Sequence, residues 1–163
     1  MDAYEKKYQR IVNNLIRKSF PLLKKKIIFV SGKKIFNFNL KYSAIIIYFI
    51  FFSWIIVHPK ARKYSKDSLK ALFAHELSHI DLIVNMNLLE KIKFAFIWLF
   101  TKKGKEDFER DADILTIKKG YGKERLKLGE ESKKTYTRNQ WRNKRKGYLN
   151  PKQIKYHIKK FKK

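Results

Sequence analysis

Residues 65–84 read SKDSLKALFAHELSHIDLIV, and this stretch decides the expected fold. Its apolar side chains recur every three or four positions, which is the spacing of an α-helix that buries one side. Ser65 can cap the start of such a helix, and Asp67 places an acid at its positive end. The sequence therefore predicts a helix over about residues 66–87.

The middle of this helix carries His75, Glu76 and His79. Two histidines four residues apart lie about one turn apart on one face, so both can reach a single metal ion, and Glu76 is placed to hold a metal-bound water. The alternative is a polar helix face with two solvated histidines. Apolar residues surround the motif, and burying these three groups without a partner would be costly, so the pattern favours a metal site.

A catalytic zinc ion needs a third protein ligand and one open position for water. The chain has no cysteine, so that ligand must be a histidine or a carboxylate. Glu109 and Asp113 lie four apart on one face of a helix predicted over about residues 105–119. One of them can bind the metal while the other holds a ligand histidine by its second ring nitrogen. The alternative is an acidic face that pairs with the abundant lysines.

Other segments predict a mixture of helix and strand. Apolar residues at helical spacing between Tyr4 and Ile16 predict an amphipathic helix, and residues 88–100 form a second apolar helical stretch. Residues 27–30 are apolar, residues 31–34 fit a turn and residues 35–40 alternate strictly, which together predict a β-hairpin. Residues 44–57 are almost wholly apolar, but they are fewer than the roughly 20 that a membrane-spanning helix needs, and their β-branched and aromatic content favours one or two buried strands.

The charge of the chain is strongly positive. The 163 residues include 40 Lys and Arg against 14 Asp and Glu, for a net charge of +26, which favours an anionic partner such as nucleic acid, an acidic protein segment or an anionic membrane surface. The 44% of hydrophobic residues excludes a disordered basic tail protein. The start of the chain mixes acids with lysines and lacks a signal-peptide cleavage site, so we expect a cytoplasmic protein, with membrane association as the alternative.

Residues 133–163 carry 13 basic residues and no acid. We therefore expect a compact domain over residues 1–132 and a basic C-terminal extension over 133–163, ending in a short helix that starts at Pro151. A solvated extension is one interpretation. Binding to an anionic membrane or to nucleic acid is another, because Tyr136, Trp141 and Tyr148 interleave with the charges, although no nucleic-acid-binding module is recognisable.

Two motifs together resemble a known family. The segment Ala74–Ile80 and, about thirty residues later, the segment Phe108–Asp113 are similar to the HExxH and ExxAD motifs of gluzincin zinc metallopeptidases. The resemblance is to the small minigluzincins and to the HtpX-like and CAAX-protease-like membrane metallopeptidases, and it covers about residues 27–127. It implies an α+β fold in which a small antiparallel sheet packs on an N-terminal helix, an active-site helix and a glutamate helix.

The resemblance also implies roles for individual residues. His75, His79 and Glu109 would bind one Zn²⁺ per chain, Glu76 would be the general base, and Asp113 would orient a ligand histidine. In the minigluzincins the third ligand is a histidine, so Glu109 is closer to the membrane-bound members. The implied activity is that of a zinc-dependent metalloendopeptidase that hydrolyses a polypeptide substrate; the alternative is a non-enzymatic basic protein that binds nucleic acid or anionic membrane.

Three further expectations concern the surroundings of this site. A developing oxyanion needs a second electrophile, for which Tyr121 and His58 are candidates, although each is equally plausible as a packing or turn residue. An extended substrate would pair with an exposed edge strand, for which residues 53–58 are the candidate. C-terminal segments block the cleft in minigluzincins, which implies that residues 147–151 cross the cleft and keep the enzyme latent, like a zymogen.

Overall fold

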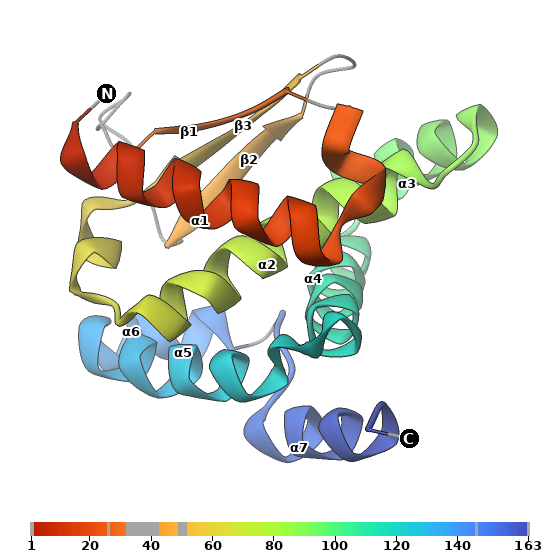
Figure 1. The fold of residues 1–163 in the computed structure, drawn as a ribbon. Helices are drawn as coiled ribbons and strands as arrows, with labels where there is room; N and C mark the ends of the chain where they lie inside the picture. The colour runs from red at the N-terminus through yellow and green to blue at the C-terminus, as the bar shows by residue number, and fades with distance from the viewer. Residues whose placement is uncertain (1, 26, 32–42, 49–51, 146, 163) are drawn as a thin grey trace.

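A computed structural model describes residues 2–25, 27–31, 43–48, 52–145 and 147–162. The described part has the expected α+β fold, in which helices pack on one side of a small three-stranded sheet (Figure 1). Helix α2, Lys66–Val84, lies at the centre, between the sheet and α1 on one side and α4 and α5 on the other. The predicted helix over residues 66–87 is confirmed, and the Ser65 side chain caps it by accepting a hydrogen bond from the Ser68 N–H.

Helix α1, Ala3–Ser19, confirms the predicted amphipathic helix. Asp2 caps it, with Glu5 bonding back to the cap. It ends at Phe20, directly before the short helix η1, Pro21–Lys25. Its apolar side packs onto α2 and the sheet, and these residues are buried: Tyr8, Ile11, Val12, Leu15 and Ile16.

The sheet contains β1, Ile27–Ser31, β2, Ala44–Tyr48, and β3, Phe52–Val57, in the order β1-β3-β2. The described parts of the apolar run 44–57, residues 44–48 and 52–57, thus form two strands, as expected. The sheet is mixed rather than antiparallel, because β3 pairs antiparallel with β2 but parallel with β1. Alternation identifies a strand, whereas its direction depends on how the connecting chain returns. The second strand of the expected hairpin, residues 35–40, lies outside the described residues.

Two helices and a tight turn follow α2. Helix α3, Leu88–Phe100, matches the predicted second apolar helix, and α4, Lys102–Thr116, contains the predicted acidic motif. The chain then passes through η3, Ile117–Tyr121. Gly120 has a φ of 96°, a left-handed conformation that glycine adopts without a steric penalty, and this turn redirects the chain into the next helix.

The basic C-terminal region folds back onto the rest of the molecule. Helix α5, Gly122–Thr135, continues through residue 132, so the expected boundary lies inside a helix. Helices α6, Arg138–Lys144, and α7, Pro151–Lys160, follow, and α7 packs against α5 and η3 (Figure 1). A small cluster of buried side chains joins these elements: Ile117, Leu149 and Ile154. Within the described residues, none of the helices combines the length and apolarity that crossing a membrane requires.

Candidate metal centre

The central turns of α2 hold the histidine motif inside the protein. His75, Glu76 and His79 keep only 4%, 7% and 8% of their surfaces exposed. Neighbouring apolar residues of α2 are also buried, because the sheet, α1, α4 and α5 enclose this part of the helix. The motif therefore does not form a solvated polar face, and its polar groups must find partners within the protein.

Three ligand atoms from α2 and α4 converge at one point. His75 Nε2 lies 3.0 Å from Glu109 Oε2 and 3.2 Å from His79 Nε2, and His79 Nε2 lies 3.4 Å from Glu109 Oε2. A tetrahedral zinc ion with bonds of about 2.0–2.1 Å places its ligand atoms roughly 3.3 Å apart. Two imidazoles and one carboxylate are also the ligand types of a catalytic zinc site. The three residues therefore fit a zinc ion in both geometry and chemistry.

Asp113 connects the triad to the protein behind it. Its Oδ1 lies 2.9 Å from His75 Nδ1, so this carboxylate can fix the ring with Nε2 facing the other ligands. Arg125 of α5 donates to both carboxylate oxygens, at 2.6 and 3.1 Å, and the Leu149 N–H donates to Oδ2 at 3.0 Å. Asp113 is fully buried, and these contacts compensate for the cost of burying its charge.

The pKa values describe carboxylates that stay ionised beside the ligand histidines. Burial raises the pKa of Asp113, but Arg125 and His75 outweigh it and lower this pKa to about 2. Burial also raises the pKa of Glu109, yet the two histidines hold it well below its usual range. Burial lowers the pKa of His75, whereas Asp113 and Glu109 raise it to about 9. Both carboxylates are therefore ionised near neutral pH, next to the imidazole nitrogens.

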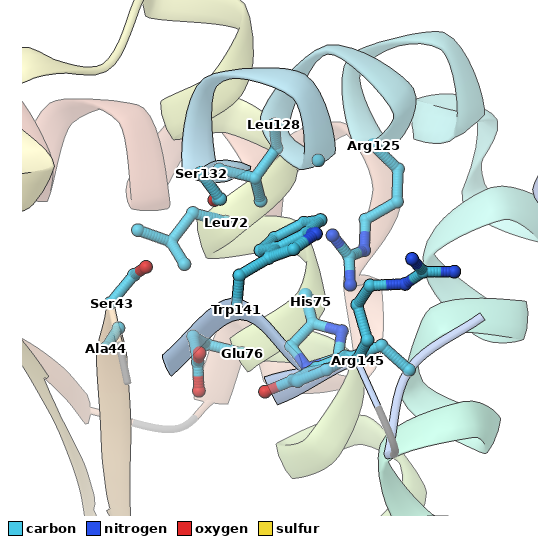
Figure 2. Close-up of a pocket in the computed structure, with 12 residues that line it drawn as sticks. Ser43, Ala44, Leu72, His75, Glu76, Arg125, Leu128, Ser132, Trp141 and Arg145 are labelled. Atoms are coloured by element: carbon cyan, nitrogen blue, oxygen red, sulfur yellow. The ribbon is translucent and has the colours of Figure 1, made fainter. Parts of the chain in front are cut away.

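Glu76 faces open space beside the triad. It lines a cavity of about 400 Å³ together with β2, α3 and α4, and this cavity also contacts His79 and Glu109. It also lines a smaller cavity, of about 40 Å³, which brings Glu76 and His75 together with Trp141 and Arg145 from the C-terminal region (Figure 2). A water or substrate group in either space would be next to the Glu76 carboxylate.

Tyr148 from the C-terminal region lies against the motif. Its ring centroid is 5.4 Å from that of His75, and the Arg125 guanidinium lies 5.2 Å from the centre of the Tyr148 ring. Tyr148 lines both cavities. Burial raises the pKa of its hydroxyl well above the usual value, as do the charges of Glu109 and Glu76, so the phenol keeps its proton. The segment 147–151, expected at the cleft, thus places one aromatic side chain directly beside the candidate ligand His75.

The structure places two other predicted residues away from the triad. The Tyr121 hydroxyl bonds with Ser19 Oγ at 2.8 Å, and its ring packs against the main hydrophobic core. His58 caps the short helix η2, Pro59–Lys63, where its Nδ1 accepts a hydrogen bond from the Lys60 N–H. Neither residue lines the two cavities beside the triad. Tyr121 therefore acts as a packing residue and His58 as a helix cap, and neither lies where it could stabilise an oxyanion at the triad.

The strand that the sequence suggests for pairing with a substrate, residues 53–58, does not lie at an edge of the described sheet. Residues 53–57 form most of β3, which lies in the middle of the described sheet with a strand on either side. Its backbone groups are already paired, so it cannot receive a substrate. Strand β2 lies at the edge of the described sheet, and its residues line the larger cavity: Ala44, Ile45, Ile46 and Tyr48. The sequence also does not predict that Arg125 pairs with Asp113, because Arg125 is one of 40 basic residues and belongs to no recognisable motif.

Comparisons of this chain with protein-family models, with curated proteins and with solved structures found no match. The case for a function therefore depends on the site itself. Its main features are three converging ligand atoms, a buried carboxylate that orients one of them, and a second carboxylate, Glu76, beside an open cavity.

Proposed function

We propose that this protein is a zinc-dependent metalloendopeptidase that holds one Zn²⁺ through His75, His79 and Glu109. The observation that carries this proposal is the convergence of three ligand atoms, two from α2 and one from α4, which lie 3.0, 3.2 and 3.4 Å from one another. Glu76 directly follows His75 on the buried part of α2. A structural role for the histidines would not need this convergence, nor a carboxylate facing a cavity beside it.

The chemistry divides between the metal and the side chains of the chain. When bound, Zn²⁺ supplies Lewis acidity for a scissile carbonyl and lowers the pKa of a coordinating water toward about 7. Glu76 accepts a proton from the attacking water and returns it to the leaving amine. Asp113 keeps the His75 ring in place through Nδ1, and Arg125 keeps Asp113 ionised and in position.

An extended polypeptide is the substrate that the cleft suits best. Strand β2 is at the edge of the described sheet and borders the 400 Å³ cavity, so a peptide can pair with its backbone beside Glu76. Tyr48 of β2 and Phe94 and Phe108 from the helices also line this cavity, and they provide apolar surface for substrate side chains.

The C-terminal region makes the enzyme latent in this proposal. Tyr148 occupies space between the two cavities and touches the face of the motif on which a substrate carbonyl would approach. A Tyr148→Ala substitution is then expected to raise the rate of hydrolysis. A fall in kcat with unchanged zinc content would contradict latency and would instead indicate that the protonated Tyr148 hydroxyl stabilises the transition state.

The activity is tested with zinc-loaded wild-type protein and with Glu76→Gln, using a fluorescently labelled unfolded protein as substrate. Loss of the general base is expected to reduce hydrolysis by roughly 10²–10⁴-fold. Glu76→Gln keeps all three proposed ligands, so its zinc content is expected to equal that of wild type. Equal cleavage by the two proteins would exclude Glu76 as the base. Because Tyr148 keeps the wild type latent in this proposal, the absence of cleavage by wild type and by Tyr148→Ala alike would contradict the proposed activity.

A further inference from the structure

Helix α3 exposes a continuous apolar surface. None of its 13 residues is buried, and Leu88, Leu89 and Phe100 keep 73%, 78% and 73% of their surfaces exposed. Figure 1 shows α3 at the side of the molecule, away from the sheet. Six large apolar side chains form this surface, which we call the α3 apolar face: Leu88, Leu89, Ile92, Phe96, Leu99 and Phe100.

The α3 apolar face is bordered by positive charge. At 3.6 residues per turn, Lys91 and Lys93 lie about 100° on either side of Ile92, at the two margins of this face. Three more lysines, Lys102, Lys103 and Lys105, follow directly after the helix and are exposed. A lipid surface accepts this pattern, because the apolar side chains enter the acyl region while the lysines stay at the level of anionic headgroups.

The opposite side of α3 is already occupied. The rings of Phe94 and Phe108 lie 4.5 Å apart, and Lys105 of α4 lies 5.4 Å from the centre of the Trp98 ring. Gly104 of α4 comes so close to Ile97 that an added Cβ would collide with its side chain. These contacts hold α3 against α4 and turn the α3 apolar face outward, so the other described parts of the chain leave it exposed.

We propose that the α3 apolar face docks on an anionic lipid bilayer. A helix of 13 residues is about 20 Å long, shorter than the roughly 30 Å hydrocarbon core, so α3 lies along the membrane surface. Phe94 and Trp98, on the opposite side of the same helix, line the proposed substrate cavity, so docking places this cavity about one helix diameter, roughly 10 Å, from the membrane surface. A second copy of the chain fits the face less well, because docking two copies would bring together lysines of two chains that each carry a net charge of +26.

The test uses full-length protein and sedimentation with vesicles of equal parts phosphatidylglycerol and phosphatidylcholine. The triple variant Ile92→Ser, Phe96→Ser, Leu99→Ser is expected to bind roughly 100-fold more weakly than wild type. Its matched control is Leu22→Ser with Tyr156→Ser, which changes two apolar residues of similar exposure elsewhere on the surface and is expected to bind like wild type. Circular dichroism confirms that each variant is folded.

The charge contribution is tested with Lys91→Gln and Lys93→Gln together, against Lys152→Gln and Lys155→Gln on α7 as the control. The first pair is expected to weaken binding by roughly tenfold or more, and the second much less. Equal binding by the triple variant and wild type, or equal losses in the two lysine pairs, would show general attraction to a cationic protein and overturn the proposal. A dimer in sedimentation velocity that the triple variant loses would assign the face to a second copy instead. The Glu76→Gln protein is expected to bind vesicles like wild type, which separates docking from catalysis.

Discussion

Helices α2 and α3 follow each other in the chain and are both rich in apolar residues, yet their environments are opposite. Thirteen of the 19 residues of α2 are buried, whereas α3 has none among its 13. The sheet, α1, α4 and α5 enclose α2, while α3 packs mainly on α4. Burial therefore depends on which elements surround a helix, and apolar composition alone does not predict it.

In the roles proposed for these helices, this difference separates two tasks. Enclosure fixes the side chains of α2 in a single arrangement, which a set of metal ligands requires. Exposure leaves α3 free to meet another surface, at the expense of solubility.

Shortening one leucine in each helix contrasts the two environments directly. Leu77 is fully buried in the core around α2, whereas Leu99 keeps 58% of its surface exposed. Leu77→Ala is expected to lower the free energy of unfolding by about 2–5 kcal/mol, because it leaves a cavity, and Leu99→Ala by less than about 0.5 kcal/mol. Urea denaturation measures both. Equal losses of unfolding free energy would mean that α3 is buried in solution and would contradict the difference between the two helices.

The buried surroundings of α2 lead to a second prediction, which compares the zinc affinity of two variants. Asp113→Asn removes the charged partner of His75 Nδ1, and we expect the affinity for zinc to fall roughly 10–100-fold in a competition titration. Arg125→Gln is the matched control, because it breaks the same ion pair from the other side but leaves the Asp113 carboxylate next to His75. Because Arg125 also holds Asp113 in position, Arg125→Gln is expected to weaken zinc binding less than Asp113→Asn, and a loss as large as that of Asp113→Asn would contradict the role of the Asp113 charge.

A smaller effect concerns hydroxyl groups near the start of α2. Tyr136 bonds with Ser43, and burial raises its pKa to about 12 from the ordinary value of 10. Between pH 10 and 12 the folded protein keeps a proton that the unfolded chain has lost, so the contribution of Tyr136 to stability is present below pH 10 and is lost as the pH rises through 12.

The measurement compares wild type with Tyr136→Phe by urea denaturation at several pH values. The stability difference between them is expected to shift by on the order of 1 kcal/mol against wild type from pH 9 to pH 12. Subtracting the variant removes the effect of the many lysines that titrate in the same range. If the stability difference between wild type and Tyr136→Phe did not change with pH, the Tyr136 hydroxyl would have the same pKa in the folded and unfolded protein. That result would mean that water reaches this hydroxyl in the folded state.

Local features of the sequence were enough to predict the helices that carry the site. Ser65 and the apolar period predict α2, and the bounds expected for the second apolar helix are those of α3. The motif spacing also selects His75, His79 and Glu109, which the structure brings together. These features depend on residues within one or two turns of each other, where spacing and geometry are directly linked.

Contacts between distant segments could not be predicted in this way. The parallel pairing of β1 with β3, the Asp113–Arg125 ion pair and the approach of Tyr148 to His75 all join separate elements. The exposure of α3 has the same origin, because an apolar helix gives no sign of whether other elements will cover it. Their positions in the sequence make His58 and Tyr121 candidates for stabilising an oxyanion, but their hydrogen bonds hold them away from the triad.

The central claim is that α2 and α4 hold one zinc ion, and elemental analysis of purified protein after dialysis against micromolar zinc tests it most directly. We expect about one zinc per chain in wild type and in His157→Ala, which changes a histidine on α7, and less than about one tenth as much in His79→Ala and Glu109→Ala. Wild-type protein without zinc, or equal zinc in all four proteins, would contradict the claim.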